Sequence, residues 1–152
     1  MTDRLTLASH SPWSDGSMKQ LARHRQDVVD LSARAEAAVL VPQDAGGWPA
    51  RWRLQIAAMI CEANGQPGRA GMYRQAAAEA APAVMDAALD TAATSFAKKV
   101  ATEPRAVTAD DVAALRAAGV SDADVVRLCE LVSFVSYQCR AEIGHALLAG
   151  TP

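Results

Sequence analysis

Apolar side chains recur along most of this chain at intervals of three and four residues, which is the repeat of an amphipathic helix. Prolines and glycines interrupt the pattern and divide it into segments. We expect helices over about residues 17–41, 49–63, 69–81, 84–101, 108–119 and from 121 to at least 147. No segment alternates persuasively between apolar and polar residues, and no internal repeat is visible. The pattern therefore predicts an all-α bundle of five to seven helices.

The first two expected helices differ in how much of their surface is apolar. The first has one apolar stripe, which consists of Leu21, Val28, Leu31, Ala35 and Ala38. His24 falls on this stripe, and we expect it to be a partly buried structural histidine. The helix over residues 49–63 has almost no polar face beyond Arg51, Arg53 and Gln55, so it should lie at the centre of the bundle.

Capping residues mark the two expected C-terminal helices. Thr108 can cap one helix with Asp111 at its third position, and Ser121 can cap the last helix with Asp124. Length favours one domain, because 152 residues suffice for a single core. We expect an irregular N-terminal arm over residues 1–16 and one helical domain over residues 17–150.

Composition excludes several classes of function. The net charge is −2 and no cluster of Lys or Arg stands out, whereas nucleic-acid binding needs a concentrated basic face. The longest apolar runs are too short to span a bilayer, and the N-terminus lacks the apolar core of a signal peptide. These features predict a cytoplasmic protein that binds neither nucleic acid nor membrane.

The cysteines and histidines indicate no disulfide framework and no metal site. The three cysteines, Cys61, Cys129 and Cys139, are widely spaced and odd in number. Cys129 and Cys139 would be roughly 15 Å apart along one helix, too far to bridge, and we interpret all three as core thiols. The histidines are scattered, at His10, His24 and His145. Because no phosphate-binding loop is present either, we expect no metal and no cofactor.

Three segments resemble a known family. Residues 106–126 resemble the short helix and capped turn of alkylhydroperoxidase D-like proteins, which belong to the carboxymuconolactone decarboxylase superfamily. Residues 134–140 resemble the apolar and aromatic ending of that family's last helix, and residues 51–75 resemble its active-site helix pair. The similarity spans roughly residues 30–148 and is greatest to the peroxidase-related subgroup. It implies an alkylhydroperoxidase D-like helical bundle that forms homo-oligomers, as dimers, trimers or hexamers.

The resemblance also locates the family's catalytic groups, and all of them are replaced here. The Cys-x-x-Cys pair would fall at Gln66 and Arg69, its histidine at Tyr73 or, in a shifted register, Met72, and its glutamate at Leu54. Peroxide reduction needs a thiolate and a nearby resolving thiol, with acid and base groups to move protons. The family's dithiol mechanism is therefore not expected at these positions.

Two functions follow from this combination. The first is a redox-degenerate member of the family, acting as a binding or structural subunit, for example beside an active paralogue. The second is an enzyme with altered chemistry. That chemistry would be either peroxidase-related, through Cys61 with the adjacent Glu62, or a cofactor-free reaction on a small carboxylic acid. Guanidinium groups suit carboxylates, so the acid would be bound by Arg51, Arg53, Arg69 and Tyr73.

Overall fold

The computed structural model of the protein describes residues 16–148, with side chains from Arg25 onward. Every regular element in this range is helical, which confirms the all-α prediction. In chain order the elements are α1 (Gly16–Leu40), α2 (Ala50–Ala63), α3 (Pro67–Glu79), α4 (Ala87–Thr102), the 3-10 turn η3 (Pro104–Ala106), α5 (Ala109–Ala117) and α6 (Asp122–Leu148). The expected N-terminal arm, including His10 and Trp13, lies outside the described residues apart from Gly16.

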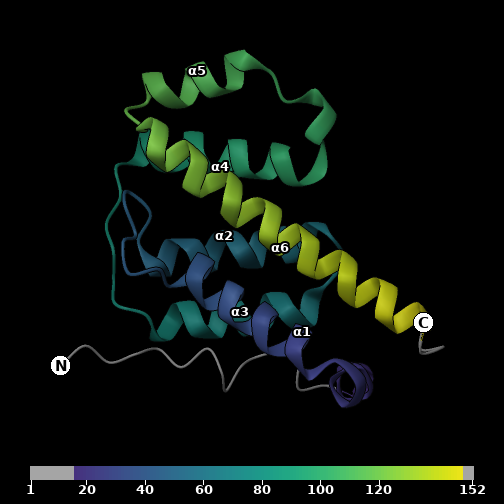
Figure 1. Ribbon diagram of the computed structural model, residues 1–152. Helices are drawn as coiled ribbons and strands as arrows, with labels where there is room; N and C mark the ends of the chain where they lie inside the picture. The colour runs from purple at the N-terminus through teal and green to yellow at the C-terminus, as the bar shows by residue number, and fades with distance from the viewer. Residues whose placement is uncertain (1–15, 149–152) are drawn as a thin grey trace.

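Helix α6 organises the bundle. It crosses the molecule diagonally, from its start beside α5 to its end near α1 (Figure 1). Along this course it packs against α1, α2 and α4, while α5 covers one side of α4. Helices α2 and α3 form the most extensive helix pair and are joined by a turn at Asn64, Gly65 and Gln66. Gly65 has a φ of 71°, a left-handed conformation that favours glycine.

Local capping chemistry determines where several helices begin. At α5 the Thr108 backbone N–H donates to Asp111 Oδ2 at 2.7 Å, within a reciprocal capping box. At α6 the Asp124 backbone N–H donates to Ser121 Oγ at 3.1 Å. Both predicted caps are confirmed.

The start of α4 differs from the sequence-based expectation. We expected a helix from Val84, but α4 begins at Ala87 and Val84 is 99% exposed. The reason is Asp86, whose carboxylate accepts from the backbone N–H groups of Ala88 and Leu89, both at 3.0 Å. This N-cap ends the preceding extended segment three residues later than apolar periodicity suggests.

The inward face of α1 also differs from the expected stripe. From Arg25 onward, where the side chains of α1 are described, the helix buries Val29, Ser32, Glu36 and Leu40, whereas Leu31 of the expected stripe is 58% exposed. Two of the four buried residues are polar, so hydropathy alone selects the wrong face. The helix bends at Arg25, where φ is −142° and ψ is 55°. The backbone of His24 lies in α1, but its side chain is outside the described part.

The core lies between α2, α3, α4 and α6. Helix α2 buries most of its residues, as predicted for a central helix. Trp48 and Trp52 stack with ring centroids 4.6 Å apart, and both are buried in this core. Within the described residues, no helix has the length and apolar character needed to cross a membrane.

Candidate functional site

Two cysteines from helices far apart in the sequence meet in the core. Cys61, near the end of α2, lies with its Sγ 3.5 Å from Sγ of Cys139 on α6, and both residues are fully buried. This is an S–H···S contact, longer than the roughly 2.05 Å of a disulfide bond. The prediction that these two are buried thiols is confirmed, but their contact was not foreseen. Cys129 is only partly buried.

The contact makes the two thiols chemically unequal. A hydrogen bond between the sulfurs lowers the pKa of Cys139, and the positive charge of Arg69 lowers it further against the effect of burial. The same hydrogen bond, followed by burial, raises the pKa of Cys61. The pair therefore loses its first proton as a unit, and the directions of the two pKa shifts favour the thiolate on Cys139, with Cys61 donating a hydrogen bond to it.

Arg69 on α3 is the central cation of the site. Its Nε donates to Oε2 of Glu142 at 3.0 Å, and its Nη2 pairs with the other oxygen of the same carboxylate. Its Nη1 lies 3.6 Å from Glu36 Oε1 on α1. Burial acts to lower the pKa of Arg69, but the bond to Glu142 raises it overall, so the guanidinium stays charged. One buried cation thus faces two carboxylates from two other helices.

Tyr73 connects this cation to α1 and α6. Its hydroxyl accepts from Arg69 Nη1 at 3.1 Å and donates to Glu36 Oε1 at 2.6 Å. It also lies 3.0 Å from Oε1 of Gln138 on α6. Burial, and then the negative charge of Glu36, raise the pKa of Tyr73, so the phenol stays neutral. We refer below to Glu36, Arg69, Tyr73, Gln138 and Glu142 as the polar cluster.

Sequence reasoning found only part of this site. It identified Cys61, Arg69 and Tyr73 but did not connect them with the residues supplied by α1 and α6. One usable signal was present: Cys139 and Glu142 are three residues apart and share a face of one helix. No comparable signal connects Cys61 with Cys139, because 78 positions separate them.

The positions that correspond to the family's catalytic groups do not form one site. Arg69 and Tyr73 belong to the polar cluster, while Leu54 is a fully buried core residue. Gln66 lies at the N-cap of α3, where its backbone N–H donates to the Cys61 carbonyl at 2.8 Å. Hence two of these four positions contribute side chains to the cluster.

The other candidate residues are dispersed as well. Glu62 points away from its neighbour Cys61 and forms an exposed ion pair with Arg74. Glu62 and Arg74, together with Arg51, line an open groove of about 370 Å³ between α2 and α3. The groove and the thiol pair therefore lie on different sides of α2, since Cys61 is fully buried.

Arg53 is committed to the backbone, which corrects its expected place on a polar face of α2. It is 3% exposed, and its three nitrogens donate to the carbonyls of Trp48, Val39 and Ala45 at 2.9, 3.0 and 2.9 Å. Burial, and then the charge of Arg127, lower its pKa. The arginines at 51, 53 and 69 thus have separate surroundings, and the geometry gives no support to one basic pocket that they share.

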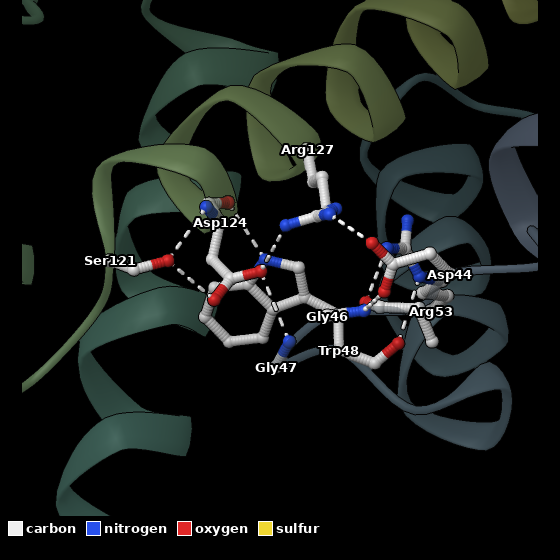
Figure 2. Close-up of polar contacts among 9 residues, drawn as sticks. Asp44, Gly46, Gly47, Trp48, Arg53, Ser121, Asp124 and Arg127 are labelled. Carbon is white, nitrogen blue, oxygen red and sulfur yellow. Dashed lines mark hydrogen bonds and ion pairs between the residues drawn. The ribbon is translucent and has the colours of Figure 1, made fainter.

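Figure 2 shows where Arg53 holds the loop between α1 and α2. On the other side of this loop, the carboxylate of Asp124 on α6 accepts from the Gly47 N–H at 3.0 Å. Trp48 Nε1 donates to the Asp124 carbonyl at 2.8 Å, and Arg127 bridges Asp124 and Asp44. Hydrogen bonds from Gly47, Ser121 and Arg127 outweigh burial and lower the pKa of Asp124. This arrangement anchors the loop.

The described residues include no group of three or more His, Cys, Asp or Glu side chains placed to hold a metal ion. His145 lies in the last turns of α6, partly exposed and away from any such group. The expectation that no cofactor is needed stays a prediction.

Comparison of the chain with family models, curated proteins and solved structures gives no match. The resemblance to alkylhydroperoxidase D-like proteins therefore rests on the sequence segments that suggest it.

Proposed function

We propose that the protein is a thiol-based oxidoreductase that reduces small hydroperoxides, with Cys139 as the attacking thiolate and Cys61 as the resolving thiol. The single observation that carries this proposal is the 3.5 Å separation of the two buried sulfurs. Peroxidatic cysteines need a lowered pKa and a second thiol in reach, and both conditions hold here. Of the two functions expected from the sequence, this proposal develops the second, an enzyme with peroxidase-related chemistry that uses Cys61.

The reaction balances in two steps. The Cys139 thiolate attacks one oxygen of a hydroperoxide ROOH, the O–O bond breaks, and with one proton from water the products are a sulfenic acid and ROH. Cys61 then attacks the sulfenic sulfur, its thiol proton leaves with the hydroxide as water, and a Cys61–Cys139 disulfide forms. An external dithiol reduces this disulfide and restores both thiols. The peroxide is reduced and the two cysteines are oxidised.

This chemistry is that of the alkylhydroperoxidase D family with a different source of sulfur. In that family both thiols follow one turn, whereas here they would come from α2 and α6. Glu142, Glu36 and Tyr73 would replace the family's acid and base groups around the thiols. We therefore propose membership of the peroxidase-related subgroup, with a displaced thiol pair.

Thiol counting after oxidation tests the proposal. The reduced protein is treated with hydrogen peroxide, denatured, and its free thiols are counted. We expect two of the three thiols to be lost, a Cys61–Cys139 disulfide in the peptide map, and full recovery with dithiothreitol. The Cys129→Ser variant is the matched control, because its thiol lies outside the pair, and it should form the same disulfide. Preferential oxidation of Cys129 would contradict the proposal.

The degenerate-subunit expectation is the alternative outcome of this experiment. Three thiols that stay reduced in excess peroxide would favour a structural or binding role over catalysis. The expectation of a homo-oligomer accompanies either function, and exposed apolar side chains on α6, such as Tyr137, Leu147 and Leu148, are compatible with a subunit contact. Light scattering on the purified protein measures the oligomeric state, and a monomer would contradict this part.

A further inference from the structure

Gln138 has unused hydrogen-bonding capacity in the core. It is fully buried on α6, and its Nε2 has no partner among the described residues. Leaving a buried amide group without a partner costs free energy, so such a group points to a bound water or a ligand. The Gln138 amide is thus an incomplete part of the polar cluster.

The carbonyl oxygen of the Gln138 amide also lacks a good hydrogen-bond donor. Gln138 Oε1 faces the Tyr73 hydroxyl at 3.0 Å, but that hydroxyl has one hydrogen and donates it over the shorter 2.6 Å contact with Glu36. If the amide is turned over, Nε2 can donate to Tyr73, and Oε1 then takes the position without a partner. In both orientations one buried amide atom needs a small polar guest.

Hydrogen bonds connect the Gln138 amide to the surroundings of the thiol pair: it contacts Tyr73, Tyr73 accepts from Arg69, and Arg69 pairs with Glu142, three residues beyond Cys139. Gln138 directly precedes Cys139, and its partner Tyr73 is close enough to Cys61 for a charge on that thiol to act on the phenol. The positive charge of Arg69, which donates to the Tyr73 hydroxyl, acts to lower the pKa of both thiols. The guest of Gln138 would therefore share a small buried region with the reactive sulfurs.

The polar cluster also restricts the guest. Both cysteines are fully buried, and the most exposed charged side chain of the cluster, Glu142, is only 17% exposed, which disfavours bulky oxidants. One guanidinium faces two carboxylates, which disfavours anionic oxidants. Hydrogen peroxide is small and neutral, and it both donates and accepts hydrogen bonds, as the free amide atom requires in either orientation.

We infer that the Gln138 amide binds the oxidant next to Cys139 and that this oxidant is hydrogen peroxide in preference to branched organic hydroperoxides. The inference rests on the proposed thiol function and adds to it a substrate class and a residue that touches the substrate. Its reaction is the two-step one given above, with water in place of ROH.

Oxidant selectivity provides the test. Rates of Cys61–Cys139 disulfide formation are measured with hydrogen peroxide and with tert-butyl hydroperoxide, and each is divided by the rate of free cysteine with the same oxidant. For the wild-type protein we expect this normalised rate to be at least about tenfold higher for hydrogen peroxide. Equal normalised rates, or a preference for the branched oxidant, would overturn the inference without using any variant.

The Gln138→Met variant tests the residue itself, because methionine has a similar shape but lacks the amide. Loss of one hydrogen bond to the bound oxidant should reduce the hydrogen peroxide rate by about tenfold. The rate with tert-butyl hydroperoxide should stay within about twofold, whereas a purely structural disturbance would change both rates together. The Ser133→Ala control changes an exposed side chain on the same helix and should leave both rates unchanged.

The outcomes separate this inference from the proposed function. If hydrogen peroxide forms the disulfide equally fast in Gln138→Met and in the wild type, the guest of the amide is a structural water and the inference is wrong. The thiol function would survive that result. If no disulfide forms in the wild-type protein with either oxidant, the proposed function itself fails, and the inference fails with it.

Discussion

The Tyr73 hydroxyl on α3 donates to Glu36 Oε1 on α1 across 2.6 Å, in a region that is closed to solvent. This bond explains why α1 turns a glutamate inward. It gives Glu36 a neutral donor in addition to the charge of Arg69, and it fixes the rotation of α1 about its own axis. The contact between α1 and the rest of the bundle is therefore partly polar.

Replacing Tyr73 with phenylalanine should destabilise the fold. The change keeps the ring but removes the hydroxyl, which leaves Glu36 with the charge of Arg69 alone and Gln138 with no partner. We expect the free energy of unfolding in urea to fall by about 1–3 kcal/mol, the cost of leaving buried polar groups unpaired. Tyr137→Phe is the matched control, since Tyr137 is 51% exposed, and it should change stability by less than about 0.5 kcal/mol. Equal effects of the two substitutions would contradict the role given to Tyr73.

Much of the helical layout was predictable because its signals are local. The bounds of α2, the end of that helix at Asn64 and Gly65, and the caps at Thr108 and Ser121 follow from neighbouring residues alone. Backbone conformation and capping bonds involve positions only two to four residues apart, so a single sequence contains the information.

The polar cluster was not predictable in the same way. Apolar periodicity selects a stripe through Leu31, whereas α1 rotates so that Glu36 meets Arg69. That ion pair joins helices distant in sequence, as does the contact of Cys61 with Cys139, and neither leaves a mark in local spacing. Arg53 was misplaced for a related reason, because its partners are backbone carbonyls that have no sequence signature.

The role of Arg53 can be tested by a substitution that keeps its charge. Lysine cannot supply the planar fork that reaches three separate carbonyls, so at least one buried carbonyl should lose its partner. We expect Arg53→Lys to lower the free energy of unfolding by about 1–3 kcal/mol. Arg51→Lys, two residues earlier on the same helix, is the control, because Arg51 lines the surface groove. If Arg53→Lys leaves the free energy of unfolding unchanged, the loop does not depend on the guanidinium.

The anchor at Asp124 should depend on pH. Because the pKa of Asp124 is lowered in the folded protein, its carboxylate stabilises the fold above the ordinary aspartate pKa of about 3.9. This contribution is lost as the pH falls through the lower, folded-state pKa. At pH 7 Asp124→Asn should destabilise the protein by about 1 kcal/mol, and the difference from wild type should shrink below about pH 4. Urea unfolding at several pH values measures both effects.

Asp122→Asn is the control for this experiment, because Asp122 lies in the same helical turn but its side chain is 76% exposed and pairs with Arg116 at the surface. It should change stability by less than about 0.5 kcal/mol at pH 7. A difference between Asp124→Asn and wild type that stays constant down to pH 2 would show that the carboxylate charge does not contribute.

The final prediction concerns the charge beside the thiols. Glu142 lies three residues beyond Cys139, and its negative charge acts to raise the pKa of that thiol, against the hydrogen bond from Cys61 and the charge of Arg69. Glu142→Gln removes this negative charge, so the pKa of Cys139 should fall further. Because only the thiolate attacks peroxide, the midpoint of the oxidation rate against pH should move to lower pH. Glu130→Gln is the control on the same helix, since Glu130 acts on Cys129, and it should leave the midpoint unchanged. A midpoint that moves upward in Glu142→Gln would mean that the carboxylate serves mainly to hold Arg69 against the sulfurs, and that the cation governs the reactive thiol through that ion pair.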